Sequence, residues 1–318
     1  MPSIRSRLMR RLIQLAITKG NKRHIPVTRI RRRMECFMTA GLPLQVRIEP
    51  VSAGGVPGEW VIPGSVNREV NGGPTLLYLH GGGYIAGSLK THRRFVTRLV
   101  KELDMPGFHV DYRLAPEHPF PAAVEDCFAA YQWLLHQGVP PESLVIGGES
   151  AGGAFVITTL LQARDNGMPL PVAGFCFSPH VDFCYQGESI TTRAAVELFL
   201  TRDDLQWGKT VYAGNNDPHL PLLSPLYADL RGLPPLLIQA ADDELFRDDA
   251  VRLAARAREA GVEVELKIWE ELWHAFQLFP FIPESRQAIE EVCEFINKRI
   301  QTPGVRIQNK NLTRRFYP

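Results

Sequence analysis

The stretch that decides the fold is residues 144–154, Leu-Val-Ile-Gly-Gly-Glu-Ser-Ala-Gly-Gly-Ala. A short apolar run that contains β-branched residues leads into a glycine-rich turn, and the apolar segment 155–163 follows without a helix breaker. This order predicts a buried strand, a sharp turn and a buried helix. The turn contains Gly148-x-Ser150-x-Gly152, the pattern of a nucleophile elbow, in which a serine stands between a strand and a helix.

The glycines of this turn have a physical role if Ser150 is a nucleophile. A Cβ atom at either flanking position would collide with the neighbouring strand or helix. The helix that follows directs its positive N-terminal end at negative charge that develops beside the serine. Because the same pattern also occurs in tight strand-to-helix connections without any chemistry, the catalytic interpretation depends on the rest of the chain.

Strand-like and helix-like segments alternate along the chain, which predicts an α/β protein with a mostly parallel central sheet flanked by helices. Two antiparallel edge strands are expected between residues 44 and 63. Residues 182–222 break the alternation, and we interpret them as an insertion over the sheet edge. The other predicted strands cover residues 75–80, 107–112, 143–146, 172–177, 235–240 and 262–268. Phe95, Leu99 and Leu103 lie on one helical face, and the other predicted helices cover residues 4–17, 26–39, 119–135, 203–212, 248–260 and 283–300.

The composition suits a globular α/β protein. The chain has 318 residues, 45% of them hydrophobic, which fits one large domain with insertions or two ordinary domains. No apolar run approaches the roughly 20 residues that span a bilayer, and a secretory cleavage site is not apparent. The five cysteines form no C-x-x-C pair, so neither a disulfide framework nor a metal site is expected. We therefore expect a cytoplasmic protein without a bound metal.

Basic residues are concentrated near the N-terminus. Residues 1–34 contain 11 of the 36 Lys and Arg residues and no Asp or Glu, so the remainder has 25 basic against 34 acidic residues, a net charge of −9. Ile4, Leu8, Leu12 and Leu15 have helical spacing within this arm. We expect this amphipathic helix to pack its apolar face on the body of the same chain. Contact with a membrane surface is the alternative, and no nucleic-acid partner is expected.

A serine nucleophile needs a base to take its proton. In sheets that carry this elbow, the order along the chain is serine, acid, histidine. Of the nine histidines, only His180, His219 and His274 follow the serine, and only His274 lies beyond the acidic cluster 242–249. It lies in a loop after the predicted strand 262–268, where a base belongs. We predict that His274 is the base, the alternative being a loop histidine packed against aromatic neighbours.

The acid is expected just after the predicted strand 235–240, at the same edge of the sheet. Two of the acidic residues there, Asp248 and Asp249, suit the first turn of the next helix, where carboxylates interact favourably with the helix dipole. The spacing does not separate the other neighbours, Asp243 and Glu244. The full set of acidic candidates is Asp242, Asp243, Glu244, Asp248 and Asp249.

A tetrahedral intermediate needs backbone N–H donors, and two places in the sequence offer them. One is Ala151, the residue after the serine, and the other is the glycine run 81–83, where no side chain covers the amides. Residues 81–86, Gly-x-Gly-x-x-Ala, also match a relaxed dinucleotide fingerprint, which would predict a nicotinamide cofactor. We favour the oxyanion interpretation because it also accounts for the serine and the histidine, and we expect no cofactor.

Three motifs occur in a characteristic order: His-Gly-Gly-Gly-Tyr at 80–84, Asp-Tyr-Arg-Leu-Ala-Pro-Glu at 111–117 and Gly-Glu-Ser-Ala-Gly-Gly at 148–153. Together they resemble the hormone-sensitive-lipase-like branch of the α/β-hydrolases. The resemblance runs from about residue 60 to residue 300. It implies the α/β-hydrolase fold and the hydrolysis of carboxylic esters, usually of short acyl chain, without a cofactor.

The resemblance also implies a helical cap. Residues 1–45 and the insertion 182–222 match the description of that cap. Residues 46–181 and 223–302 would then form the α/β-hydrolase core, and residues 303–318 would be a C-terminal tail.

The resemblance further implies which acidic residue is catalytic. Placing Asp248 on the last aspartate of the family's acid motif puts Glu244 at the catalytic position. Leu245, where proline is frequent, and residues 246–247 depart from the motif, and glutamate replaces the commoner aspartate. Asp243 therefore remains the alternative.

The resemblance assigns the oxyanion donors as well. The second and third glycines of the run, Gly82 and Gly83, would donate together with Ala151. Residues 111–117 are expected to brace this loop rather than to take part in the chemistry.

We therefore predict a serine carboxylesterase with Ser150, His274 and Glu244 as its catalytic residues, acting on small esters of short-to-medium acyl chain. Two alternatives are a protein of the same fold that binds a small molecule without hydrolysing it, and a long-chain lipase. The sequence leaves open whether the protein is a monomer or a homodimer.

Overall fold

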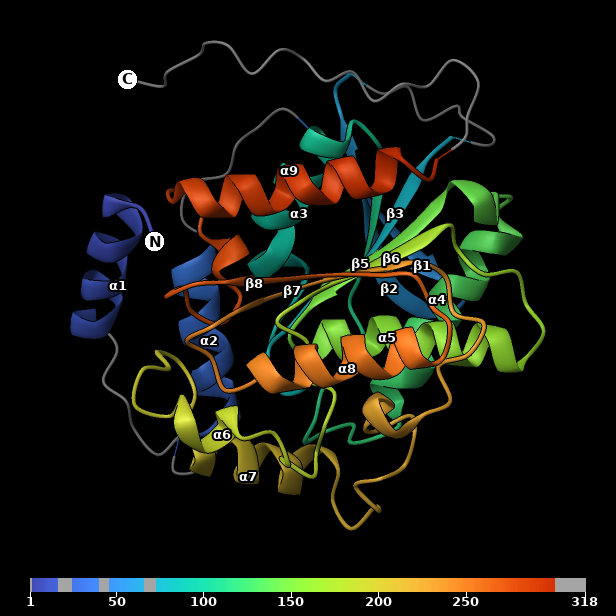
Figure 1. Cartoon of the computed structure of the whole chain (residues 1–318). Helices are drawn as coiled ribbons and strands as arrows, with labels where there is room; N and C mark the ends of the chain where they lie inside the picture. Colours follow the sequence, from blue (N-terminus) through green and yellow to red (C-terminus); the bar gives the residue numbers. More distant parts are fainter. Residues whose placement is uncertain (1, 17–24, 40–45, 66–72, 301–318) are drawn as a thin grey trace.

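An eight-stranded sheet forms the centre of the computed structural model, which describes residues 2–16, 25–39, 46–65 and 73–300. The strands are β1 (Val46–Ala53), β2 (Val56–Pro63), β3 (Thr75–Leu79), β4 (Gly107–Val110), β5 (Leu144–Glu149), β6 (Ala173–Phe177), β7 (Leu236–Ala241) and β8 (Val264–Trp269). Their order is β1-β2-β4-β3-β5-β6-β7-β8 (Figure 1). Strand β2 pairs antiparallel with β1 and β4, and all the other pairs are parallel.

Helices cover both faces of this sheet (Figure 1). One face carries α3 (Leu89–Leu103) and α9 (Pro283–Asn297), and the other carries α4 (Ala122–His136), α5 (Ala151–Asp165) and α8 (Arg247–Glu259). Four helices lie outside these layers: α1 (Ile4–Ala16), α2 (Val27–Met38), α6 (Ser189–Thr192) and α7 (Arg202–Tyr212). The predicted α/β fold with a mostly parallel sheet is confirmed.

Strand β3 shows why the central strands are apolar throughout. Leu76 and Tyr78 belong to the core beneath α3 and α9, whereas Leu77 and Leu79 belong to the core on the opposite face. Successive side chains of a strand point to opposite faces, so a strand covered by helices on both sides needs apolar residues at every position.

The predicted insertion, residues 182–222, leaves the sheet after β6 and contains α6 and α7. It is anchored to α8 by hydrogen bonds and an ion pair of two buried acidic side chains. The fully buried carboxylate of Asp249 accepts the backbone N–H groups of Val181 (2.9 Å) and Asp182 (3.1 Å). Asp182 in turn forms an ion pair with Arg252 at 2.6 Å. Asp249 lies in the first turn of α8, as predicted. Its side chain also accepts hydrogen bonds from the backbone where the insertion begins.

Helix α1 packs on the body through the face opposite to the one that the sequence suggests. Ile4, Leu8, Leu12 and Leu15 are 71%, 55%, 61% and 85% exposed, whereas Ile13 is buried. The prediction that the four apolar residues pack on the body of the chain is therefore wrong, although the helix itself does pack there.

Polar contacts select the buried face of α1. The hydroxyl of Ser6 donates to Glu284 at the start of α9 (2.5 Å), and the backbone N–H of Ser3 donates to the same carboxylate. The Arg10 guanidinium donates to Asp243 (2.7 Å). Hydrophobic spacing does not reveal such partners, because they lie more than 200 residues away in the sequence.

Parts of the predicted domain organisation lie outside the described residues, namely the tail 303–318 and residues 17–24 and 40–45 of the N-terminal segment. Among the helices that the structure does describe, none combines the length and the apolar character needed to cross a bilayer.

Candidate active site

The turn between β5 and α5 holds Ser150 in a backbone conformation that L-residues rarely adopt, with φ 55° and ψ −118°. A Cβ atom on Gly148 would lie 2.5 Å from the carbonyl oxygen of Leu79, and a Cβ atom on Gly152 would overlap the same oxygen. Glycine is required at both positions because β3 approaches the turn this closely. The elbow predicted from the sequence is present, and its glycines have the predicted role.

Neighbouring segments fix this strained turn from two sides. The backbone N–H of Ser150 donates to the carbonyl of Phe177 at the end of β6 (2.9 Å). The N–H of His180 donates to the carbonyl of Ser150 (3.1 Å). An unfavourable backbone conformation persists only where the surroundings over-determine it, and these bonds do so at the serine.

His274 lies beside the serine. Its Nε2 is 3.0 Å from the Ser150 hydroxyl oxygen, which is hydrogen-bond distance. The loop after β8 turns the ring inward because Ala275 adopts a left-handed conformation (φ 52°) and its N–H donates to the Ser178 hydroxyl (3.1 Å). The neighbouring Trp273 is buried in a separate apolar cluster, so the histidine is not simply packed among aromatic side chains.

Glu244 is the carboxylate that reaches the histidine. Its Oε2 lies 3.2 Å from the His274 Nδ1, on the side of the ring opposite to the serine. Asp243 turns away and forms an ion pair with Arg10 of α1 at 2.7 Å. Asp242 is also directed elsewhere, since it contacts arginine side chains at 3.1 Å. Of the two neighbours that the spacing left unresolved, Glu244 is the one in contact with the base.

Buried charge sets the basicity of the histidine. Ser150 and His274 are only 9% and 8% exposed, and Glu244 is fully buried. Burial alone lowers the pKa of His274, but the hydrogen bond to Glu244 and the charge of that carboxylate outweigh it, so the net pKa lies above the ordinary value of 6.5. Burial raises the pKa of Glu244, and the hydrogen bond with His274 opposes that effect.

The glycine loop that follows β3 places backbone amides next to the serine. Gly82 and Gly83 have φ values of +129° and +63°, which favour glycine. A Cβ atom on Gly81 would lie 3.1 Å from the Cβ of Ser150, so the loop is in direct contact with the elbow. Within the described part of the chain, the N–H groups of Gly82, Gly83 and Ala151 donate to no other protein atom. They are free to bind an oxyanion.

The motif at 111–117 braces this loop, as predicted. The Tyr112 hydroxyl donates to the backbone carbonyl of His80 (2.6 Å). The N–H of Ala115 donates to the carbonyl of Tyr84 (3.0 Å). Both ends of the glycine run are therefore tied to the segment after β4.

Glu149 is a site residue that the sequence analysis missed. Its buried carboxylate accepts the N–H of Gly81 (2.5 Å) and the hydroxyl of Tyr78, and it lies 2.8 Å from the Nε2 of His92. The residue before the nucleophile thus holds the first glycine of the oxyanion loop. The sequence signal that could have identified Glu149 is an acidic residue at the end of a strand that is otherwise apolar.

Glu197 in the insertion is a second such residue. Its side chain is fully buried, and its two carboxylate oxygens accept the N–H groups of Phe199 (2.8 Å) and Leu245 (3.1 Å). Because Leu245 follows Glu244 directly, this contact fixes the loop that carries the acid. No local pattern marks Glu197, because its partner lies 48 residues away in an irregular segment.

The loop geometry does not suit the dinucleotide fingerprint. Helix α3 begins only at Leu89, and the side chain of Ser88 caps its N-terminus in a capping box. The N–H of Gly81 is already bound by the carboxylate of Glu149, whose charge would repel a phosphate. Within the described ranges, no group of three or more His, Cys, Asp or Glu side chains could hold a metal ion.

The chain is also similar in sequence to known proteins. Residues 76–278 match the α/β-hydrolase fold family. The chain is 41% identical to an acetyl-hydrolase of Streptomyces hygroscopicus over 83% of this chain and 86% of the relative. It is 34% identical to an esterase of Acinetobacter venetianus, over 79% and 82% of the two chains.

Solved structures are similar to this chain as well. The crystal structure of an esterase from the bacterial hormone-sensitive lipase family is 39% identical, covers 94% of this chain and 99% of its own, and superposes with a TM-score of 0.88. EstE5 is 36% identical, with 94% and 100% coverage and a TM-score of 0.90. The chain therefore belongs to the α/β-hydrolase family and, within it, to the carboxylic ester hydrolases that resemble hormone-sensitive lipase.

Proposed function

We propose that this carboxylic ester hydrolase cleaves esters of short-to-medium acyl chain through a covalent acyl-enzyme on Ser150. The observation that carries the proposal is the continuous relay from Ser150 through His274 to Glu244, with contacts of 3.0 and 3.2 Å. A serine hydroxyl is a weak nucleophile unless a base accepts its proton, and an oriented, buried imidazole provides that base.

The acylation half of the reaction follows from this geometry. The Ser150 oxygen attacks the ester carbonyl carbon while the Nε2 of His274 takes the hydroxyl proton. Negative charge develops on the former carbonyl oxygen, and the N–H groups of Gly82, Gly83 and Ala151 stabilise it; one such donor is typically worth about 2.7–4 kcal/mol. The C–O bond to the alcohol then breaks, and the histidine gives its proton to the departing oxygen.

Deacylation repeats these steps with water. His274 takes a proton from a water molecule, whose oxygen attacks the acyl carbon, and the same amides hold the second oxyanion. The bond to Ser150 breaks, the serine regains a proton from the histidine, and the carboxylic acid leaves. Throughout, Glu244 holds the ring in one tautomer and stabilises the imidazolium.

Aromatic side chains pack beside His274. The Phe246 ring stacks on His180 with centroids 4.3 Å apart and meets the His274 ring edge-on at 5.4 Å. All three rings are buried. The preference for small acyl groups is supported by the name of the Streptomyces relative, an acetyl-hydrolase.

We also propose that α1, α2 and the insertion 182–222 form the cap over this site. Polar contacts from each of the three parts support it. Arg10 of α1 binds Asp243 beside the acid, and Glu197 of the insertion binds the N–H of Leu245 on its other side. Arg31 of α2 donates to the backbone carbonyls of Ile85 (2.7 Å) and Ala115 (2.9 Å), next to the oxyanion loop.

The first test is the hydrolysis of p-nitrophenyl esters from acetate to palmitate by the wild type and by Ser150→Ala. We expect a maximum at short acyl chains and a loss of roughly 10⁶-fold in kcat in the variant, the size seen when a catalytic serine is removed. Thermal unfolding of the variant should be nearly unchanged. A maximum at long chains would instead support a lipase, and unchanged turnover in Ser150→Ala would refute the proposed nucleophile.

Alanine substitutions at Glu244 and Asp243 test which of these neighbouring residues is the catalytic acid. Glu244→Ala should lower kcat/KM by roughly 10⁴-fold, because the histidine loses the partner that fixes its tautomer. Asp243→Ala should cost about tenfold or less, since it removes only the contact with Arg10. Steady-state kinetics on p-nitrophenyl butyrate measure both values. A larger loss at Asp243 would overturn the assignment of the acid.

The pH profile of kcat/KM reports the pKa of His274, which must be neutral to act as a base. Because that pKa is raised, activity should fall as the pH drops through a value above 6.5. In Glu244→Gln the carboxylate charge that raises the pKa is gone, so the acid limb should move to lower pH while the residual rate is reduced. An acid limb at the same pH in both proteins would show that Glu244 does not act on the base.

A further inference from the structure

The outward face of α1 has a regular arrangement. At about 100° per residue, Ile4, Leu8, Leu12 and Leu15 fall within an arc of about 80° around the helix axis. All four side chains are more than half exposed. The opposite side of the helix, which contains Ile13, packs on the body. Helix α1 therefore packs on the body through Ile13 and the polar contacts of Ser6 and Arg10, and its apolar stripe faces solvent.

Arginines border the exposed apolar stripe on both sides. By the same spacing, Arg5 follows the stripe on one side, and Arg11 and Arg7 follow it on the other. All three are exposed, and the helix contains no acidic residue. An apolar stripe between cationic side chains is the arrangement of helices that lie in the interface of a lipid bilayer.

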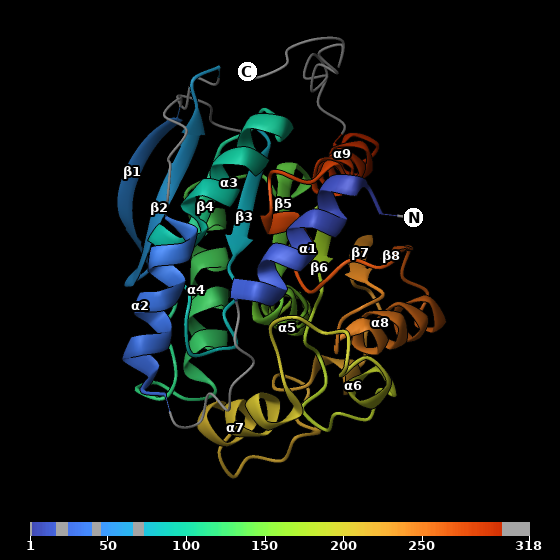
Figure 2. The same cartoon turned by 90° about the vertical axis from the view of Figure 1, so that its left-hand side faces the viewer.

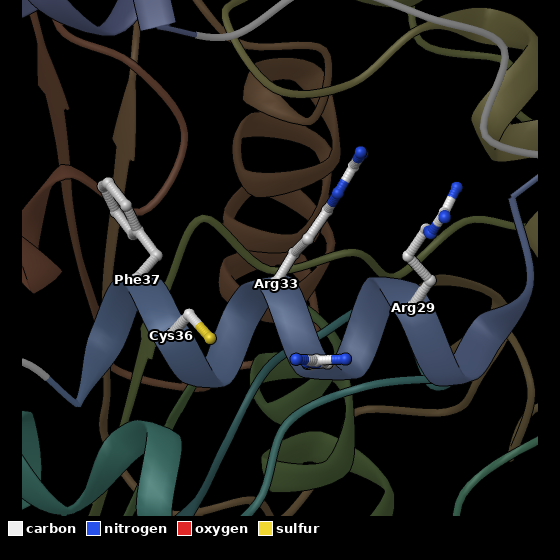
Figure 3. A pocket seen from close by; sticks show the side chains of 5 residues that line it. Arg29, Arg33, Cys36 and Phe37 are labelled. Carbon is white, nitrogen blue, oxygen red and sulfur yellow. The ribbon is translucent and has the colours of Figure 1, made fainter.

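Helix α2 also has arginines on an exposed face, together with one exposed aromatic side chain. Arg29, Arg32 and Arg33 share one exposed face with Cys36 and Phe37, and Phe37 is 66% exposed. These five side chains line a surface hollow of about 470 Å³ (Figure 3). Both α1 and α2 lie in front of the sheet in the view of Figure 2, on the same side of the molecule.

A single inward arginine anchors each helix. Arg10 of α1 donates to Asp243 and to the carbonyls of Val196 (2.8 Å) and Glu271 (2.9 Å). Arg31 of α2 forms an ion pair with Glu117 at 2.7 Å. Arg10 and Arg31 thus attach the two helices to the core. The other six arginines of α1 and α2 face outward.

We propose that this outward face of α1 and α2 docks the enzyme on the surface of an anionic phospholipid bilayer. The apolar stripe of α1 and Phe37 would enter the headgroup region, and the six outward arginines would bind the lipid phosphates. Charge complementarity identifies the partner. Residues 1–34 carry only basic charge, whereas the rest of the chain has a net charge of −9, so a negative surface attracts the N-terminal segment that contains α1 and most of α2.

Two other partners match the face less well. In a symmetric pair of chains the same patch would meet itself, which would bring the arginines of both copies together. A nucleic-acid backbone would use the arginines but would leave the exposed leucines without an apolar partner. A lipid surface accommodates both features.

Docking in this orientation would place the catalytic machinery next to the bilayer. The inward arginines tie the docking helices to the acid loop, through Asp243, and to the segment beside the oxyanion loop, through Ile85. The proposal does not depend on the catalytic mechanism, because binding to lipid is measured without turnover.

The experiment is flotation of the full-length protein with vesicles of phosphatidylcholine alone or of an equimolar mixture with phosphatidylglycerol. We expect the wild type to bind the mixed vesicles at least tenfold more tightly than the neutral ones, and to be released by salt. The variants Leu8→Ser/Leu12→Ser and Arg5→Gln/Arg7→Gln/Arg11→Gln should each bind at least tenfold more weakly. Leu220→Ser, at an exposed leucine between α7 and β7, is the matched control and should bind like the wild type.

Circular dichroism and thermal unfolding check that the variants remain folded, which their exposed positions favour. Equal binding to both kinds of vesicle, no binding, or unchanged binding by the leucine and arginine variants would each overturn the proposal. So would a wild-type dimer that Leu8→Ser/Leu12→Ser dissociates, because the face would then be a contact between copies. Salt-sensitive binding to duplex DNA that survives the leucine substitutions would equally point to a different partner.

Discussion

The left-handed backbone of Ser150 is the constraint on which the rest of the site depends. It lifts the hydroxyl out of the sheet at the end of β5, where the loops after β3, β7 and β8 can reach it. The conformation costs of the order of 1–3 kcal/mol and persists only because the surroundings exclude the alternatives. The close approach of β3 requires glycine at 148 and 152, and hydrogen bonds with Phe177 and His180 fix the serine between them.

Buried carboxylates hold the loops that converge on the serine. Glu149 accepts an N–H of the oxyanion loop, Glu197 accepts one of the acid loop, and Asp249 accepts two at the base of the insertion. Hydrogen bonds to charged groups are worth about 1.5–3 kcal/mol, and leaving a buried charge unpaired costs more. These contacts therefore specify one arrangement of the loops, and two of them link the insertion to the catalytic core.

Much of this organisation could be predicted from local patterns. Apolar runs and glycine turns gave the strands within a few residues, and the order of serine, acid and histidine singled out His274. The choice between Asp243 and Glu244 needed the resemblance to a family, because adjacent loop residues differ in side-chain direction and not in spacing. In the structure Arg10, 233 residues earlier, binds Asp243 and leaves Glu244 for the histidine. The buried face of α1 was mispredicted for the same reason, since distant polar partners select it.

In the proposed reaction Ser150 carries the acyl group. This assignment is tested by peptide mapping by mass spectrometry after the full-length enzyme has reacted with a fluorophosphonate, which forms a stable bond to an activated serine. We expect one adduct per chain, located on the peptide that contains Ser150. Labelling of a different residue, or no labelling of a folded protein that hydrolyses esters, would refute the assignment.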